Sequence, residues 1–245
     1  MKILIFALSG IGDAIMFTPS IKILRKIYPD AVIDALCMFG GVRDIYSRNK
    51  DLDNVLYYNF MKEGAAKSLS YLLKLRGKYD ASINVYPANR KEYNIFSIIT
   101  GARRRAAVKY LRQPYTNLSF LNNVTITEDD SLHNVEENLN LCRKLSGQDF
   151  DDKPGLQLDF NNDDLQAAEK FIREENITED ELVIGFHPGC ATLKNHIKRR
   201  WEPGKFAELG RKLVNQLNAR ILVFGGPEEA ELKSEVVTGI GTGRA

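Results

Sequence analysis

The chain has 245 residues, which is more than one ordinary domain of roughly 150 residues and less than two. Hydrophobic residues make up 44% of it and charged residues 27%, and the formal net charge is only +2. This composition excludes a largely disordered chain and a strong polyelectrolyte, so we expect one complete domain and a partial or small second one.

The apolar segments and the cysteines indicate a protein of the reducing cytoplasm. The longest early apolar run, residues 3–8, is far shorter than a membrane span of about 20 residues or the core of a secretory signal. Cys37, Cys142 and Cys190 are odd in number and lack CxxC spacing, which predicts neither a disulfide framework nor a zinc site. All three are expected in or near the core.

Neither a metal centre nor a nucleic-acid interface is expected. The three histidines share no ligand spacing with one another or with a neighbouring cysteine or carboxylate. The basic stretch Arg103-Arg104-Arg105, with Lys109 and Arg112, is interpreted as a solvated edge, because the charge of the whole chain is close to neutral.

An alternation of strands and helices runs from residue 2 to residue 146. Strands are predicted at 2–8, 31–38, 54–58, 81–86 and 105–108. Helices are predicted between the first two strands, after Gly40-Gly41, and at 65–76, 94–99 and 134–146. Since helices separate the strands and the first strand is apolar on both faces, the pattern predicts a doubly wound α/β domain with a parallel sheet.

Pro19 leaves the start of the first helix open. Either Thr18 caps a helix that has Pro19 at its first position, or a short helix begins near Asp13 and kinks at Pro19. In both cases the helix stops at Pro29.

A polar stretch between residues 147 and 164 is the best candidate for a domain boundary, because such a composition forms few packed contacts. We therefore predict an N-terminal domain at 1–155 and a C-terminal domain at 156–245. The second domain is predicted to contain helices at 164–175, 203–217 and 228–237 and strands at 182–187 and 219–224. Two strands are fewer than the roughly five or six of an ordinary sheet, so the second domain is expected to be incomplete as given.

The first strand leads into the loop Ser9-Gly10-Ile11-Gly12-Asp13, at the place where open parallel sheets bind ligands. Gly10 and Gly12 allow a ligand to approach the backbone, whose N–H groups at a helix start favour an anion. A dinucleotide fingerprint would need a third glycine at position 15, which is Ile15. The match is therefore weak, and a NAD-dependent oxidoreductase is kept only as an alternative function.

Asp13, at the exit of this loop, has two interpretations. It is either an ordinary acid in the first turn of a helix or a general base that takes the proton of a substrate hydroxyl. The end of the helix is expected to stabilise its charged form, which would weaken it as a base.

A second loop, residues 187–201, gathers groups suited to a diphosphate: a glycine, a hydroxyl and three consecutive cations. These residues are Gly189, Thr192, Lys198, Arg199 and Arg200. Donors and positive charge of this kind hold a diphosphate and stabilise its charge as it leaves. A solvated charge run before a helix is the alternative interpretation.

A third loop repeats the strand–glycine–helix arrangement. Gly225-Gly226 follows the strand at 219–224, and Glu228 and Glu229 follow the glycines. A carboxylate in this position caps the helix, accepts the hydroxyls of a ribose, or does both.

These loops together make the sequence similar to glycosyltransferase family 9, the ADP-heptose:lipopolysaccharide heptosyltransferases and their relatives. The segments that carry the resemblance are Leu8-Ser9-Gly10-Ile11-Gly12-Asp13 with Thr18-Pro19, His133-Asn134-Val135-Glu136 with Leu145-Ser146-Gly147, His187-Pro188-Gly189, the basic residues before Trp201, and Gly225-Gly226-Pro227-Glu228-Glu229. The resemblance spans nearly the whole chain, and the order and spacing of these segments are its specific part.

The resemblance implies a GT-B architecture of two Rossmann-like domains, with the acceptor on the first and a nucleotide-sugar donor, such as ADP-heptose, mainly on the second. It implies that Asp13 is the catalytic base of an inverting transfer of a heptose-like sugar to a glycan or lipopolysaccharide-core acceptor. The residues that it assigns to the donor are Thr192, Lys198, Arg199 and Arg200 for the diphosphate and Glu228 or Glu229 for the ribose. No cofactor or metal is implied, and contact with the inner face of the plasma membrane is expected to be peripheral at most.

The sequence departs from the family pattern in its last part. The later donor motif of the family, an acidic residue before Ser-Gly-Pro followed by His and Ala, has no counterpart before Ala245. A truncated nucleotide-sugar or glycan-binding module without turnover is therefore a further alternative. The cation two positions before Trp201, often Lys in the family, is Arg199, so the residue that contacts phosphate stays open.

Overall fold

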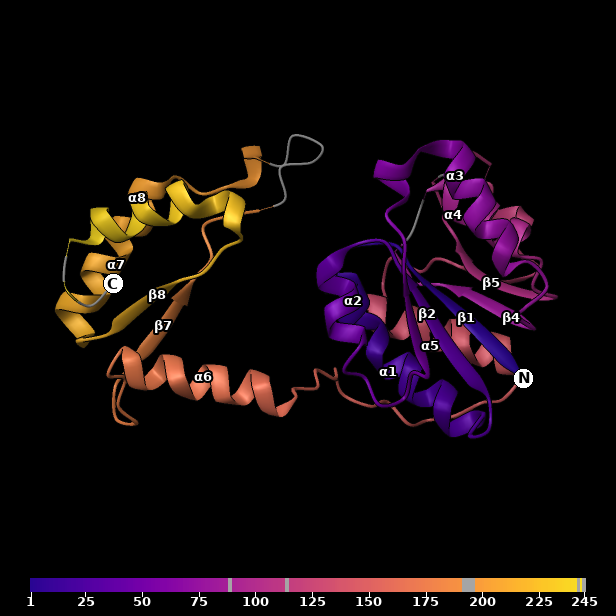
Figure 1. Ribbon diagram of the computed structural model, residues 1–245, viewed down its shortest axis with the longest axis horizontal. Coiled ribbons are helices and arrows are strands. Elements are labelled where there is room, and N and C mark those ends of the chain that lie inside the picture. The colour runs from indigo at the N-terminus through magenta and orange to yellow at the C-terminus, as the bar shows by residue number, and fades with distance from the viewer. Residues whose placement is uncertain (88–89, 113–114, 191–196, 242, 244–245) are drawn as a thin grey trace. The chain divides into compact units, whose positions relative to one another are not determined.

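Figure 1 shows the computed structural model of the chain, which describes residues 1–87, 90–112, 115–190, 197–241 and 243. The chain divides into two compact units, Met1–Asn162 (unit 1) and Asp163–Ala245 (unit 2). The division lies within the polar stretch, a few residues after the expected boundary at 155/156. Each unit has its own sheet and its own apolar core.

Unit 1 contains a six-stranded parallel sheet with the order β3-β2-β1-β4-β5-β6. Its strands are β1 (Lys2–Ala7), β2 (Val32–Cys37), β3 (Asn54–Tyr57), β4 (Ala81–Asn84), β5 (Arg104–Lys109) and β6 (Val124–Thr127). This is the strand order of doubly wound domains that bind nucleotides beyond the carboxyl ends of their strands. The predicted parallel α/β sheet is thus confirmed.

Helices cover both faces of this sheet. They are α1 (Ile11–Ile27), α2 (Gly40–Tyr46), α3 (Phe60–Leu75), α4 (Lys91–Thr100) and α5 (Asn134–Ser146), with a 3-10 turn η1 (Ser119–Leu121). Successive side chains of a strand point to opposite faces, and β1 supplies both cores: Ile3 and Ile5 pack with α1, α2 and α5, whereas Leu4 and Phe6 pack with α3 and α4. The domain is therefore doubly wound.

The helix α1 begins at Ile11 and runs through Pro19, so the alternative with a start near Asp13 is confirmed and a cap at Thr18 is wrong. A proline has no N–H to offer the carbonyl four residues earlier, which here belongs to Ile15. The hydroxyl of Thr18 donates to that carbonyl oxygen at 2.7 Å, and it also accepts a hydrogen bond from the backbone N–H of Gln157 at 2.8 Å. Thr18 thus replaces the missing backbone bond and holds the segment that follows α5 against α1.

The strand β6 has no counterpart among the predicted elements. Between β5 and β6, the residues that the structure describes form η1 and no α-helix. The alternation that located the other strands is therefore absent here. Val124 and Ile126 nevertheless pack against the core beneath α5.

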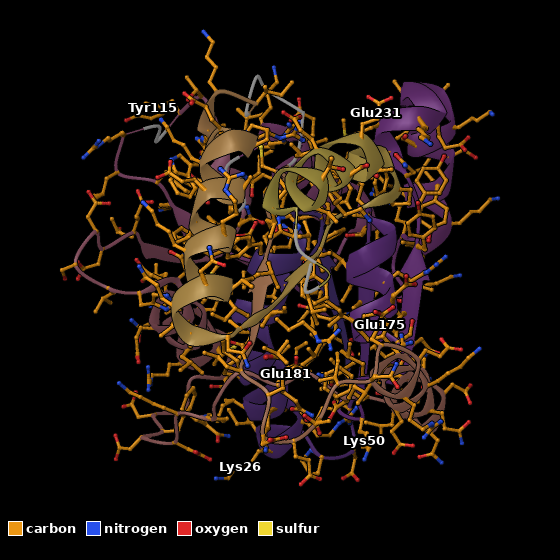
Figure 2. All side chains as sticks on the ribbon, turned by 90° about the vertical axis from the view of Figure 1, so that its left-hand side faces the viewer. Lys26, Lys50, Tyr115, Glu175, Glu181 and Glu231 are labelled. Carbon is orange, nitrogen blue, oxygen red and sulfur yellow. The ribbon has the colours of Figure 1, made fainter. Side chains whose placement is uncertain are left out.

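Unit 2 contains the parallel pair β7 (Val183–Phe186) and β8 (Arg220–Val223). Its helices are α6 (Asn162–Glu174), α7 (Pro203–Leu217) and α8 (Ala230–Ile240), with a 3-10 turn η3 (Pro227–Glu229) before α8. Arg220, at the start of β8, donates from Nε to Oε2 of Glu181 at 3.0 Å (Figure 2 labels Glu181). This ion pair joins the amino ends of the two strands, so the glycine loops extend from the opposite ends.

The core of unit 2 is small. It is formed by Phe186, Ala207, Ala219, Ile221, Val236 and Ile240, and α6 contributes no buried residue. The two predicted strands of this unit are confirmed, and its small sheet agrees with the expected partial domain. In the part of the chain that the structure describes, no helix has the length and apolar character needed to cross a bilayer.

Candidate functional site

The first candidate site lies where β1 ends and α1 begins. Gly10 is the N-cap of α1, with an extended backbone at φ −73° and ψ 174°, which any residue can adopt. A Cβ built on Gly10 or on Gly12 would meet no atom within 4 Å. Neither backbone strain nor packing therefore requires glycine here, and the open space above both residues leaves the backbone accessible to a ligand.

Asp13 occupies the first turn of α1 and is half-buried. Burial raises the pKa of its carboxyl above the ordinary value, because a carboxylate loses hydration there, and this outweighs the opposing effects of the Ser9 hydroxyl and the Gly10 backbone N–H. The sequence predicted a helix end that favours the charged form, whereas the net direction of the pKa shift is upward. A raised pKa makes the carboxylate a better proton acceptor once it is ionised.

Two tyrosines donate hydrogen bonds to the backbone on either side of Asp13. Tyr46 of α2 is fully buried and donates its hydroxyl to the carbonyl oxygen of Ala14 at 2.9 Å. Tyr93 of α4 donates to the carbonyl oxygen of Leu8 at 2.9 Å. Burial is the main cause that raises the pKa of both phenols, and the charge of Asp13 adds to the rise. Both tyrosines therefore act as fixed donors that hold the loop and the first turn of α1.

These tyrosines are not among the site residues predicted from the sequence. Tyr46 and Tyr93 lie on helices that follow other strands, and only the fold brings them to the end of β1. No local sequence motif predicts such a contact.

The second candidate site is built around Glu229, a buried carboxylate of unit 2. Its Oε1 lies 3.2 Å from Nη2 of Arg200, and its Oε2 accepts a hydrogen bond from the backbone N–H of Gly226 at 3.0 Å. The same Nη2 of Arg200 donates to the carbonyl oxygen of Cys190 at 3.1 Å. One ion pair thus ties together the loops that follow β7 and β8.

We call the Arg200–Glu229 pair, with the glycines around it, the cradle; two of these glycines leave room for the carboxylate of Glu229 in its observed position. A Cβ at Gly189 would overlap the carboxylate of Glu229, and a Cβ at Gly225 would lie 2.9 Å from Oε2 of the same residue. Gly189, singled out from the sequence, is therefore a packing requirement of the buried ion pair.

The three consecutive cations have different surroundings. Arg200 is 21% exposed and turned towards Glu229, and its Nε is buried with no hydrogen-bond partner among the described residues. Lys198 and Arg199 are exposed and make no ion pair within the described part of the chain. An unpartnered buried donor next to two unpaired cations is an arrangement that suits an anionic ligand. Thr192, the expected hydroxyl of this loop, lies outside the described residues.

The two acids of the third loop also differ. Both oxygens of the Glu229 carboxylate already accept hydrogen bonds within the protein, whereas Glu228 is exposed. Lys233, which sequence reasoning missed, donates from Nζ to the carbonyl oxygen of Gly225 at 3.2 Å. The spacing of four residues between Glu229 and Lys233 places them on one side of the helix start and is the signal that could have identified the lysine.

The basic stretch near β5 is a solvated edge only in part, because Lys109 and Arg112 are exposed but Arg104 and Arg105 bond to backbone carbonyl oxygens. Arg105 donates to the carbonyl oxygens of Ala102 and Leu121, and Arg104 donates to that of Leu145. Arg103 is exposed. Among the described residues, no group of three or more His, Cys, Asp or Glu side chains is arranged to hold a metal ion.

Comparison with known proteins shows which of them share the fold of this chain. No protein-family model matches the chain, and no curated protein matches it. Solved structures that are similar to it include a glycosyl transferase of family 9 from Veillonella parvula DSM 2008 (21% identity, TM-score 0.74), the ADP-heptose lps heptosyltransferase II of E. coli (20%, 0.70), and the E. coli heptosyltransferase WaaC with ADP-2-deoxy-2-fluoro heptose (19%, 0.67).

The alignments cover 97%, 97% and 98% of this chain and 66%, 68% and 74% of the respective structures. The chain thus spans about two thirds of the length of the first two. The resemblance stated from the sequence is confirmed at the level of the fold: the chain has the α/β fold of the GT-B glycosyltransferases of family 9.

Proposed function

We propose that the chain supplies the catalytic base and the donor loops of an inverting glycosyltransferase that uses a nucleoside diphosphate sugar. The observation that carries this proposal is Asp13, a half-buried carboxylate whose pKa burial raises, beside the open glycine loop at the end of β1. The shared fold with family 9 structures supports the reaction class.

In this reaction the hydroxyl oxygen of the acceptor attacks the anomeric carbon of the donor sugar. Asp13 takes the proton of that hydroxyl as the new carbon–oxygen bond forms. The bond between the anomeric carbon and the diphosphate breaks on the opposite face, so the configuration inverts, and the nucleoside diphosphate departs with the electron pair. A group must then neutralise the charge that develops on the diphosphate.

We assign that task to the cations of unit 2. Lys198 and Arg199 are exposed and unpaired within the described residues, so they are available to phosphate. Arg200, already paired with Glu229, supplies its buried Nε and holds the loop in shape. Exposed Glu228 is the better candidate for the ribose hydroxyls, because the Glu229 oxygens already accept bonds from Arg200 and Gly226.

The donor proposed for the first test is an ADP-sugar. One similar structure, the E. coli heptosyltransferase WaaC, is described with ADP-2-deoxy-2-fluoro heptose, and another with ADP. A heptose-like sugar and a glycan or lipopolysaccharide-core acceptor are the specific form of the proposal. We place the reaction in the cytoplasm, with contact to the membrane limited to its inner surface.

The test compares Asp13→Asn with Asp30→Asn, an exposed aspartate after the end of α1. Turnover is measured as release of nucleoside diphosphate from ADP-heptose and related donors in the presence of acceptor sugars. Loss of a general base lowers turnover about 10²- to 10⁴-fold, and only D13N is expected to show this loss. Calorimetric binding of ADP should be unchanged in both variants.

The pH profile gives a second reading. Turnover of the wild type should rise with pH through a pKa above the ordinary aspartate value of 3.8, because Asp13 must lose its proton before it can act as a base. Wild-type turnover in D13N would remove Asp13 from the mechanism. Calorimetric binding of NAD(H) instead of ADP would favour the oxidoreductase alternative.

Two further variants test the donor loop. Lys198→Ala combined with Arg199→Ala should weaken ADP binding, whereas Lys212→Ala, which removes a surface cation paired with Glu208 at 2.7 Å, should leave it unchanged. Equal ADP affinity in the wild type, the double variant and the Lys212→Ala control would contradict the assignment of these cations to the diphosphate.

A further inference from the structure

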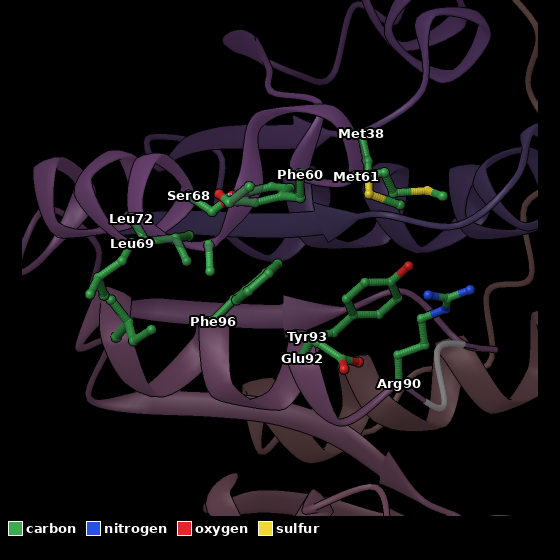
Figure 3. Close-up of a pocket in the computed structure, with 13 residues that line it drawn as sticks. Met38, Phe60, Met61, Ser68, Leu69, Leu72, Arg90, Glu92, Tyr93 and Phe96 are labelled. Atoms are coloured by element: carbon green, nitrogen blue, oxygen red, sulfur yellow. Dashed lines mark hydrogen bonds between the residues drawn. The ribbon is translucent and has the colours of Figure 1, made fainter.

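An apolar groove lies between α3 and α4 on the face of the sheet opposite to α1 (Figure 3). Its volume is about 380 Å³, within the range of about 300 to 1,000 Å³ that small-molecule sites occupy. Its walls include Met38, Phe60, Leu69, Leu72, Tyr93 and Phe96. The proposed transfer reaction, as stated above, assigns no role to it.

A break in α3 shapes one wall of the groove. Gly64 has φ 75° and ψ 167°, a conformation that is essentially restricted to glycine, and it separates the turn at Phe60 from the rest of the helix. The ring of Phe60 then reaches that of Phe96 on α4, with centroids 4.5 Å apart. The two helices thus meet at these rings, and hydrogen bonds from Arg76 and Gly77 to the carbonyl oxygens of Ile99 and Thr100 join them again at their C-terminal ends.

The rim of the groove is apolar and exposed. Met61 is 52% exposed and Leu69 is 46% exposed, and both line the groove. Large apolar side chains that converge on a concavity gain free energy when a ligand removes them from water.

One end of the groove is polar and adjoins the loop that carries Asp13. Arg90 and Tyr93 lie at this end in Figure 3, and Leu69 and Leu72 lie at the other. Tyr93 donates its hydroxyl to the carbonyl oxygen of Leu8, the residue immediately before Ser9. Burial is the main cause that raises the pKa of Tyr93, and the charge of Asp13 raises it further.

The charge at this end is available for a ligand. Arg90 is exposed and, within the described residues, makes no ion pair with Glu92, which also lines the groove, or with any other carboxylate. Arg90 is also the N-cap of α4, so its backbone lies at the positive end of that helix. An apolar channel that ends in an unpaired cation is complementary to an amphiphile with an anionic group.

We propose that the α3–α4 groove binds the hydrocarbon part of an acceptor that is a single-chain anionic amphiphile, with its anionic group at Arg90 and its reacting hydroxyl towards Asp13. The acceptor role rests on the proposed glycosyl transfer. The binding of the amphiphile does not, and it is tested separately.

The first experiment is calorimetric titration with n-hexyl, n-octyl and n-decyl phosphate and with inorganic phosphate, all below their micelle-forming concentrations. Each methylene that enters the groove should tighten binding about fourfold, up to the length that fills it. Octyl glucoside, which has the same chain without the charge, should bind more weakly than octyl phosphate. Affinities that do not depend on chain length would overturn the proposal.

Two pairs of variants locate the site. Ala65→Trp fills the groove, whereas Ala66→Trp changes the neighbouring exposed alanine that does not line it. Leu69→Glu places a carboxylate in the groove, whereas Leu73→Glu changes a leucine of similar exposure, 49%, that lies outside it. Ala65→Trp and Leu69→Glu should each lower the affinity for octyl phosphate at least tenfold, and their partners should not.

A third pair tests the charge. Arg90→Gln should remove the preference for octyl phosphate over octyl glucoside, and Lys91→Gln, the exposed neighbour, should keep it. Thermal melting identifies any variant that does not fold. If one groove variant is unfolded, the other groove variant and its partner decide whether the ligand binds in the groove. Equal loss of affinity in the groove variants and their partners would refute the groove as the site.

The outcome for glycosyl transfer is read independently. If octyl phosphate binds in the groove but D13N does not affect turnover, the proposed function fails and the binding site remains. If D13N abolishes turnover but no amphiphile binds, the proposed function remains and this inference fails. If both hold, Ala65→Trp should raise the KM for an amphiphilic acceptor without changing ADP affinity.

Discussion

Replacement of Gly189 by alanine is the sharpest test of the cradle in unit 2. A Cβ at this position would overlap the carboxylate of Glu229, which must then leave its contacts with Arg200 and with the N–H of Gly226. Glu229 is 7% exposed and Arg200 21% exposed, so the displaced charges are poorly solvated.

The cost follows from the fate of that ion pair. Separating a fully buried pair costs about 3–5 kcal/mol, and the partial exposure of Arg200 reduces the cost. We therefore expect Gly189→Ala to lower the free energy of unfolding of unit 2 by about 2–4 kcal/mol. Gly204→Ala is the control: a Cβ there meets nothing within 4 Å, and alanine in the first turn of α7 should be neutral or stabilise the unit by up to about 1 kcal/mol.

Urea unfolding followed by tryptophan fluorescence measures this effect. The chain contains one tryptophan, Trp201, which packs edge-on against Phe206 in unit 2 with ring centroids 5.0 Å apart. Its emission therefore reports the unfolding of unit 2.

A double-mutant cycle identifies the mechanism. Once Glu229 is replaced by alanine, the carboxylate that Gly189→Ala would displace is gone, so the second substitution should cost much less than it does in the wild type. Strictly additive effects, or a Gly189→Ala variant as stable as Gly204→Ala, would refute the reasoning.

Three further outcomes are expected in unit 1. Because burial raises the pKa of Asp13, D13N should be at least as stable as the wild type at pH 7. Any gain in stability should vanish below about pH 3.9, the pKa of an unfolded-state aspartate, because the wild-type carboxyl is then also uncharged. Urea unfolding of both proteins at pH 7 and pH 3 checks the sign. Asn138→Leu removes two hydrogen bonds to the backbone N–H and carbonyl of Tyr86, at 3.0 and 2.9 Å, and should cost about 2–4 kcal/mol of unfolding free energy in the same measurement. Thr18→Val should cost about 1–2 kcal/mol and speed proteolysis near Gln157, whereas Thr18→Ser retains the hydroxyl and should do neither.

The sequence pattern predicted the parts of the fold that repeat locally. An apolar run, a glycine turn and an amphipathic helix locate β1 and α1 because each signal lies within a few residues of the next. The same rule missed β6, since the described residues between β5 and β6 contain no α-helix, and it left the start of α1 open at Pro19, where the hydroxyl of Thr18 supplies the bond that the proline cannot.

The candidate site was predictable only in outline. The loops containing Asp13 and Gly189 could be identified from strand–glycine–helix spacing. Which cation turns inward could not, because Lys198, Arg199 and Arg200 are chemically alike in sequence and only Arg200 meets Glu229 in space. The groove beside α3 was likewise invisible, since its walls come from separate helices and its shape depends on one backbone break at Gly64.

The distribution of the thiols offers a practical route to observing the donor loop. Burial raises the pKa of Cys37 and of Cys142 to about 12, so both stay protonated at neutral pH and are enclosed by the core of unit 1. Cys190 is half-buried, and its carbonyl oxygen receives the bond from Arg200. Thiol-reactive dyes should thus attach to this position in the native protein without prior mutagenesis, and their emission would follow occupancy of the cradle as ligand is added.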